Sequence, residues 1–180
     1  RKELPEIPRE NIIGEPMRRD TGAAVALGVG AAGDGVLGFF SSDQMVSNPK
    51  EFKKTIKRAI VIASKKKNFV TIGIKPTFPS ADFGYVNPTT GTFVEKPNIA
   101  TARKYLEKGY LWNAGMFIAD AEVFREAFAV HQPELLQLAK SIPSKLKSVY
   151  ENLPRISFDY AVMEKVKNIS VVPGDFGWDD

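Results

Sequence analysis

Side chains capable of chemistry follow three runs of apolar residues in the chain. Asp43 follows residues 36–40, Glu95 and Lys96 follow residues 92–94, and a segment ending at Asp180 follows residues 169–172. Ligands of open α/β sheets bind beyond the carboxyl ends of the strands. Two carboxylates that converge at one sheet edge repel each other unless a cation bridges them. Asp43 and Asp180 are therefore candidate ligands of a divalent metal ion, with a turn or helix cap as the alternative role of each.

The pair Glu95 and Lys96 precedes Pro97, a residue that restricts the backbone before it. A surface ion pair is one interpretation. The other is that Glu95 accepts hydrogen bonds from ligand hydroxyls while Lys96 places a positive charge near a phosphate. Asn113 adds an amide that both donates and accepts, two positions before Gly115, which permits close approach of the backbone.

The composition limits which metal these residues could bind. The chain has no cysteine and a single histidine, His131, so disulfides, thiolate sites and a histidine-rich zinc centre are excluded. A metal would have to be held by carboxylates. Oxygen ligands of this kind suit Mg²⁺, which keeps several waters and bridges one or two carboxylates to substrate phosphates.

The elements that must position these side chains alternate between apolar runs and amphipathic stretches, which is typical of an α/β fold. Strands are predicted at residues 11–14, 36–40, 69–74, 92–94, 115–118 and 169–172. Helices are predicted from Asp20 or Thr21 to residue 31, from Pro49, and over residues 101–108, 121–130, 133–139 and 159–165. Residues 36–74 indicate one right-handed βαβ unit. We expect a Rossmann-like, mixed and mostly parallel sheet flanked by helices.

The whole-chain properties set the class of protein. At 180 residues and 43% hydrophobic, the chain fits a single domain over residues 1–180. It contains no apolar run long enough to span a membrane, so we expect no membrane partner and a cytoplasmic protein. The net charge of +4 favours anionic ligands only weakly, and we expect no nucleic-acid partner.

Motifs spread along nearly the whole chain resemble the mannose-1-phosphate guanylyltransferase family. They are Glu15-Pro16, Arg19-Asp20-Thr21, Ser42-Asp43, Gly84-Tyr85, Phe93-Val94-Glu95-Lys96-Pro97, Trp112-Asn113-Ala114-Gly115-Met116-Phe117, Asp159-Tyr160-Ala161-Val162-Met163-Glu164-Lys165 and Phe176-Gly177-Trp178-Asp179-Asp180. The most specific are the segments 93–97 and 159–165.

The resemblance implies a nucleotidyltransferase fold and the transfer of GMP from GTP to mannose 1-phosphate, giving GDP-mannose and pyrophosphate. It implies that Asp43 and Asp180 hold Mg²⁺ and that these two residues and Lys96 are catalytic, with Lys96 meeting the sugar phosphate. The implied sugar-binding residues are Gly84, Glu95, Asn113 and Asp159. The implied nucleotide-binding residues are Glu15, Arg19, Thr21 and Ser42.

The chain also departs from the family pattern. Asp20-Thr21-Gly22-Ala23 and Ser42-Asp43-Gln44 replace the family's usual residues at those positions, and the link from Tyr85 to Phe93 is shorter than usual. The glycine-rich loop that wraps the triphosphate should precede Arg1 and does not appear. We therefore expect the domain to be incomplete at both ends, lacking this triphosphate loop, and inactive by itself.

Several functions and assemblies stay open at this stage. The same chemistry could use glucose 1-phosphate with dTTP or UTP. A noncatalytic subunit that senses nucleotide sugars would keep the fold and could lose the glycine-rich loop. The sequence also leaves a homodimer open.

Overall fold

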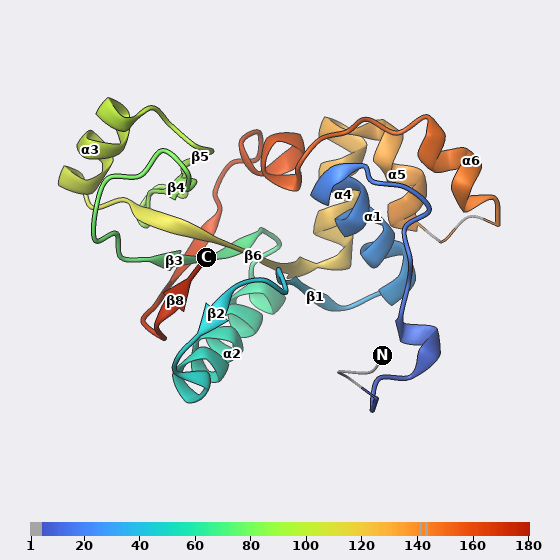
Figure 1. Ribbon diagram of the computed structural model, residues 1–180, viewed down its shortest axis with the longest axis horizontal. Coiled ribbons are helices and arrows are strands. Elements are labelled where there is room, and N and C mark those ends of the chain that lie inside the picture. Colours follow the sequence, from blue (N-terminus) through green and yellow to red (C-terminus); the bar gives the residue numbers. More distant parts are fainter. Residues whose placement is uncertain (1–4, 141, 143) are drawn as a thin grey trace.

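A computed structural model describes residues 5–140, 142 and 144–180. Figure 1 shows a central sheet with helices on its two faces. The helical elements are η1 (Arg9–Asn11), α1 (Asp20–Ala32), α2 (Pro49–Lys65), α3 (Ile99–Glu107), α4 (Ala121–His131), α5 (Pro133–Lys140), α6 (Leu146–Glu151) and η2 (Asp159–Met163). The strands are β1 (Val36–Phe39), β2 (Met45–Val46), β3 (Val70–Ile74), β4 (Tyr85–Val86), β5 (Phe93–Val94), β6 (Leu111–Asp120), β7 (Ser170–Gly174) and β8 (Trp178–Asp179).

The main sheet is organised around the long strand β6. Its order is β5-β4-β6-β3-β7, and β1 pairs with the far end of β6. The mixed α/β architecture flanked by helices is confirmed, but among the described strands only the β3–β7 pair is parallel. The parallel share is lower than expected because β6 runs antiparallel to β1, β3 and β4. Thus β1 and β3 point the same way, as the βαβ prediction requires, with β6 inserted between them.

Local signals account for the helices that were predicted well. The Asn48 side chain accepts a hydrogen bond from the Glu51 N–H at 3.2 Å, and Pro49 occupies the first turn of α2. The Asp120 side chain accepts from the Glu122 N–H at 3.0 Å at the start of α4. The strand predicted at residues 11–14 is wrong, because Ile12 and Ile13 are exposed and pair with no strand.

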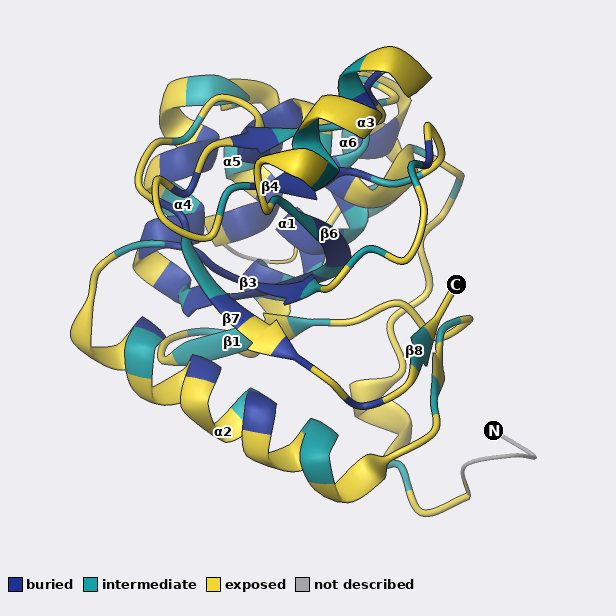
Figure 2. Ribbon diagram, turned by 90° about the vertical axis from the view of Figure 1, so that its left-hand side faces the viewer, coloured by how far each residue is buried: buried dark blue, intermediate teal, exposed yellow. Residues whose placement is uncertain are grey.

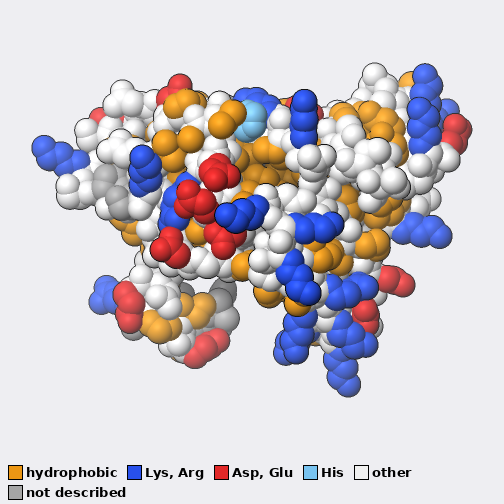
Figure 3. Space-filling view, turned by 180° about the vertical axis from the view of Figure 1, so that it is seen from behind, with side chains coloured by type: hydrophobic (Ala, Val, Ile, Leu, Met, Phe, Trp, Pro, Cys, Tyr) orange, Lys and Arg blue, Asp and Glu red, His pale blue; other side chains and the backbone are white. Residues whose placement is uncertain are grey.

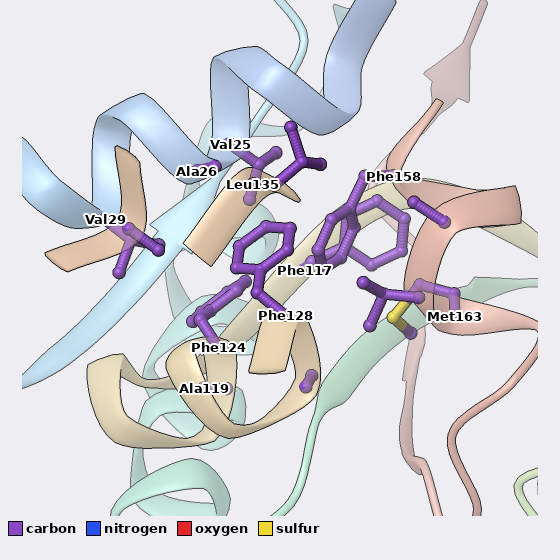
Figure 4. Close-up of a cluster of buried hydrophobic side chains, with 14 of the residues drawn as sticks. Val25, Ala26, Val29, Phe117, Ala119, Phe124, Phe128, Leu135, Phe158 and Met163 are labelled. Carbon is purple, nitrogen blue, oxygen red and sulfur yellow. The ribbon is translucent and has the colours of Figure 1, made fainter. Parts of the chain in front are cut away.

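The two faces of the sheet are covered differently. Helix α2 covers one face, with its inner side buried and its outer side exposed, while α1, α4 and α5 cover the other (Figure 2). The larger core lies on the second face and joins these helices to η2 (Figure 4). Among the described residues, no helix has both the length and the hydropathy needed to cross a bilayer.

An aromatic cluster fixes η2 against the larger core. Phe158, the residue before η2, is fully buried. Its ring centroid lies 5.9 Å from that of Phe69, 5.1 Å from that of Phe117 and 5.8 Å from that of Phe124. These are tilted or edge-to-face contacts, the arrangements that aromatic rings prefer. The position of Asp159, the next residue along the chain, is therefore set by packing.

Charged side chains are distributed unevenly over the rear of the molecule (Figure 3). Acidic groups gather at the start of α4, where Arg125 Nη1 lies 2.8 Å from Asp34 Oδ1 and 3.6 Å from Glu122 Oε2. Lysine and arginine side chains gather over α2, whose sequence is PKEFKKTIKRAIVIASK. The modest net charge of the chain therefore conceals separate acidic and basic regions.

We expect Phe158→Ala to lower the free energy of unfolding by about 3 to 5 kcal/mol, because it removes a fully enclosed ring and leaves a cavity. Chemical denaturation measures this loss. Val130→Ala, at a side chain that is 73% exposed, is the control and should change the free energy by less than about 0.5 kcal/mol. Equal effects of the two substitutions would contradict the role of Phe158.

Candidate active site

A bulge in β6 shapes the centre of the candidate site. Thr71 pairs with Phe117 and Gly73 pairs with Asn113, so Ile72 alone lies opposite residues 114–116 of β6. Gly115 has φ of +66°, a left-handed conformation that glycine adopts without steric cost. Bulges interrupt a ladder and redirect the neighbouring side chains. The chain therefore leaves the regular β6 ladder immediately after Asn113.

The side chain of Asn113 joins three elements. It is only 7% exposed. Thr71 Oγ1 on β3 donates to Asn113 Oδ1 at 2.7 Å, and Asn113 Nδ2 donates to Asp159 Oδ1 at 3.2 Å. β3, β6 and η2 are thus connected through one buried amide.

Glu95 lies beside Asn113 because position 84 has no side chain. The Asn113 N–H donates to the carbonyl oxygen of Gly84 at 2.8 Å. A Cβ atom at Gly84 would lie 2.5 Å from Glu95 Oε2 and 3.5 Å from Asn113 Cβ. From the other side, the Glu95 N–H donates to Glu164 Oε1 at 2.8 Å. The four predicted sugar-binding residues, Gly84, Glu95, Asn113 and Asp159, are therefore brought together.

Lys96 adds a positive charge at the edge of this cluster. Its Nζ lies 3.6 Å from Glu95 Oε1, and its side chain is 54% exposed whereas that of Glu95 is 9% exposed. Lys96 has φ of +41°, a conformation that is uncommon for residues with a side chain. Outliers of this kind collect at functional sites, where the surrounding structure maintains them. Lys96 thus presents an accessible ammonium group next to an enclosed carboxyl group.

Burial raises the pKa values of both carboxyl groups. For Glu95, burial and then the negative charge of Asp159 raise the pKa to about 7, despite the opposing effect of Lys96. For Asp159, burial raises the pKa to about 6, partly offset by hydrogen bonds and by Lys96. Near neutral pH, the cluster can therefore both accept and donate hydrogen bonds through its carboxyl groups. Such perturbed groups are typical of functional sites.

A cavity of about 230 Å³ borders this cluster. Its polar lining residues are Thr21, Ser41 and Asp159, which come from the start of α1, the end of β1 and η2. Thr21 Oγ1 accepts a hydrogen bond from the Phe158 N–H at 2.9 Å. Ser42, the neighbour of Ser41, is exposed. Thr21 therefore belongs to the wall next to Asp159.

The two predicted metal ligands lie at the same end of a small ribbon. In the antiparallel pair β2–β8, Met45 lies opposite Asp179 and Val46 opposite Trp178. Continuing this register places Asp180 beside Gln44, the residue after Asp43. Both aspartates are exposed. Their metal role stays a prediction.

The donor set fits a magnesium ion that keeps part of its water shell. In the part of the chain that the structure describes, no cluster of three or more His, Cys, Asp or Glu side chains could hold a metal ion. Two carboxylates supplemented by water and substrate phosphates are a usual environment of Mg²⁺. A cation held entirely by protein groups does not match these residues.

Glu15 and Arg19 have structural contacts away from this cluster. Tyr150 Oη donates to Glu15 Oε1 at 3.1 Å. Burial and the nearby Glu15 carboxylate raise the pKa of the Tyr150 phenol. Arg19 donates to the carbonyl oxygens of Tyr150 at 2.7 Å and Glu151 at 2.9 Å. These bonds attach the segment before α1 to α6, and the nucleotide-binding roles of both residues stay predictions.

Sequence reasoning missed three contributors to the site. Thr71 reads as an ordinary β-branched residue in an apolar run, although a hydroxyl in a buried strand requires a partner. Glu164 lies within a recognised motif but had no assigned role. Gln44 Nε2 donates to the carbonyl oxygen of Ala114 at 2.9 Å and so holds the bulge from the side of β2. Only contacts between distant segments reveal these roles.

The fold and the polar cluster define an α/β protein whose site suits a hydroxyl-rich, anionic ligand. A family model described as nucleotidyl transferase matches residues 2–180. The chain therefore belongs to the nucleotidyl transferase family.

Relatives in this family confirm the resemblance seen in the motifs. The chain is 31% identical over 200 residues to mannose-1-phosphate guanylyltransferase from Escherichia coli, covering 94% of this chain and 43% of that protein. It is 35% identical over 191 residues to xanthan biosynthesis protein XanB from Xanthomonas campestris pv. campestris, covering 94% of this chain and 41% of that protein. The chain thus spans less than half the length of these two relatives.

Solved structures share the fold. The crystal structure of a mannose-1-phosphate geranyltransferase from Thermus thermophilus matches with a TM-score of 0.84 and 35% identity, over 93% of this chain and 53% of that one. The crystal structure of a mannose-6-phosphate isomerase from Helicobacter pylori matches with a TM-score of 0.81 and 25% identity, over 92% of this chain and 72% of that one.

The raised carboxyl pKa values predict a pH dependence of stability. The pKa values of Glu95 and Asp159 rise from the usual 4.5 and 3.8 to about 7 and about 6, so the folded state binds these protons more tightly. Their stabilising contribution is present at acidic pH and is lost as the pH rises through 6 and 7. Glu95→Gln should reduce the decline in unfolding free energy between pH 5 and pH 8 by about 1 to 2 kcal/mol, allowing for solvent screening.

Denaturant titrations at the two pH values measure this difference. The matched control is Glu107→Gln, at an exposed carboxylate on α3, which should leave the pH dependence as in the wild type. An unaltered decline in the Glu95→Gln variant would refute the assignment.

Proposed function

We propose that the protein transfers GMP from GTP to mannose 1-phosphate, giving GDP-mannose and pyrophosphate. The single observation that carries the proposal is the hydrogen bond of 2.9 Å from Gln44 Nε2 to the Ala114 carbonyl oxygen. Gln44 follows Asp43, and Ala114 follows Asn113. This contact brings the segment that holds a candidate metal ligand next to the candidate sugar-binding cluster. The names of the relatives support the same reaction.

In the proposed reaction, a phosphate oxygen of mannose 1-phosphate attacks the α-phosphorus of GTP. A new P–O bond forms, and the bond from the α-phosphorus to the bridging oxygen of the β-phosphate breaks with release of pyrophosphate. The residues of this chain would act by positioning their substrates and compensating charge, without a covalent intermediate.

Each polar group in the cluster has a definable task in this proposal. The Lys96 ammonium group, which is accessible, would contact the sugar phosphate. Glu95, Asn113 and Asp159 would exchange hydrogen bonds with the sugar hydroxyls, since charge-assisted hydrogen bonds are the stronger ones. Thr21 and Ser42 would lie on the nucleotide side of the cavity. When bound to Asp43 and Asp180, Mg²⁺ would supply positive charge to the phosphates.

In the full-length protein, we expect Asp43→Asn and Asp180→Asn each to lower kcat at least about 100-fold, because each removes a negative charge needed to hold the cation. Pyrophosphate release from GTP and mannose 1-phosphate measures the rate, with and without EDTA. The control is Asp179→Asn, at the exposed neighbour of Asp180, which should stay within about threefold of the wild type. Full turnover by either of the first two variants would exclude the metal role of that residue.

We also expect GDP-mannose to raise the melting temperature more than dTDP-glucose or UDP-glucose at equal concentration, because a ligand stabilises the folded state according to its affinity. A thermal-shift series with the three sugar nucleotides measures the ranking. A larger shift with either glucose nucleotide would replace the proposed substrates by glucose 1-phosphate and dTTP or UTP. Stabilisation without any pyrophosphate release by the full-length protein would instead identify a sensing subunit.

A further inference from the structure

Thr71 is the one polar side chain in β3, and it is fully buried. Its Oγ1 lies 2.7 Å from Asn113 Oδ1 and 3.0 Å from the carbonyl oxygen of Met116. Both acceptors flank the bulge in β6, where Ile72 faces residues 114–116. A threonine hydroxyl has a single proton to donate, so only one of these acceptors receives it at a time.

The Asn113 amide has two possible orientations, in which either Oδ1 or Nδ2 faces Thr71. When Thr71 donates to Asn113 Oδ1, the Nδ2 group faces Asp159 Oδ1 at 3.2 Å. If the amide were reversed, its oxygen would face the Asp159 carboxylate, and two acceptors would meet without a proton between them. The ionised Asp159 carboxylate therefore selects this amide orientation, and Thr71 completes it by donating to Asn113 Oδ1. Such fully satisfied buried networks are rigid.

The selected orientation leaves further hydrogen-bonding capacity on both Asn113 and Asp159. Asn113 Nδ2 carries two protons and gives one to Asp159, so one donor stays available. The second oxygen of Asp159, on the wall of the cavity, is an acceptor. A ligand hydroxyl can accept from the first group and donate to the second.

We propose that Thr71 is a positioning residue that holds the Asn113 amide and the Asp159 carboxylate in the arrangement that binds a hydroxyl of the sugar phosphate. This inference rests on the proposed function for the identity of the ligand. Thr71 does not reach the ligand itself, because it is fully buried and acts through Asn113.

Other charged groups also act on Asp159 and must be kept unchanged in a test. Glu95 and Lys96 follow β5, and Asp20 begins α1. Lys96 lowers the pKa of Asp159 and Asp20 raises it, while the Asn113 hydrogen bond lowers it. Glu164 holds the backbone of Glu95. Loss of the Thr71 hydroxyl alters only the Asn113 contribution, so the pKa of Asp159 should rise.

The test compares two substitutions at one position. Thr71→Val keeps the shape but removes the hydroxyl, and Thr71→Ser keeps the hydroxyl. Calorimetric titration should show mannose 1-phosphate binding weakened about tenfold in Thr71→Val and within about twofold of the wild type in Thr71→Ser. GTP binding should stay within about twofold in both variants, because the hydroxyl supports the sugar-binding cluster alone.

A second measurement needs no ligand. The carbon signal of the Asp159 carboxyl group, followed by NMR against pH, should show a pKa raised by about 0.5 to 1 in Thr71→Val and unchanged in Thr71→Ser. An unchanged pKa in Thr71→Val overturns the inference. An equal loss of GTP and mannose 1-phosphate binding, with a lower melting temperature, also overturns it, because that pattern indicates general destabilisation.

The two proposals fail in distinguishable ways. If the wild-type protein does not bind mannose 1-phosphate, the proposed substrate is wrong, and the NMR titration alone decides whether Thr71 positions Asp159. If the wild type binds it and Thr71→Val binds equally well, the role of Thr71 is wrong while the proposed function stands.

Discussion

The bulge in β6 is the constraint on which the candidate site depends. Because Ile72 alone faces residues 114–116, the pairing of the two strands is interrupted between Asn113 and Phe117. At this point the carbonyl oxygen of Ala114 accepts a hydrogen bond from Gln44 Nε2, and that of Met116 lies 3.0 Å from Thr71 Oγ1. The same irregularity thus joins the β2 strand, β3 and the buried amide of Asn113.

The acidic character of the site is stabilised by packing elsewhere. Enclosing Glu95 and Asp159 disfavours their ionised forms, as their raised pKa values indicate. The aromatic cluster around Phe158 holds η2 in place, although enclosing the ionised carboxyl group of Asp159 costs free energy. Two left-handed residues, Asp20 at +65° and Lys96 at +41°, border the same region. The packing of hydrophobic side chains therefore keeps Glu95 and Asp159 enclosed, although the two carboxyl groups would by themselves favour exposure to water.

The sequence predicted those features whose causes are local. Helices α2 and α4 have side-chain caps within a few residues of their starts, so their existence could be predicted from the sequence. The order of strands around β6 and the two-residue pair β2–β8 depend on contacts between distant segments, and no local pattern encodes them. The resemblance to a family identified the residues around Asn113. It could not identify Thr71, because a threonine in an apolar strand looks like any β-branched residue.

The absence of a side chain at Gly84 affects both the polar cluster and the core beside it. A Cβ atom there would lie 2.5 Å from Glu95 Oε2 and 3.2 Å from the Cζ atom of Phe93, a buried ring of the larger core. To accommodate it, Glu95 would have to turn aside and Phe93 would have to shift, so the shape and charge of the cluster would change. Gly84 thus ties the shape of the polar cluster to the packing of the core beside it.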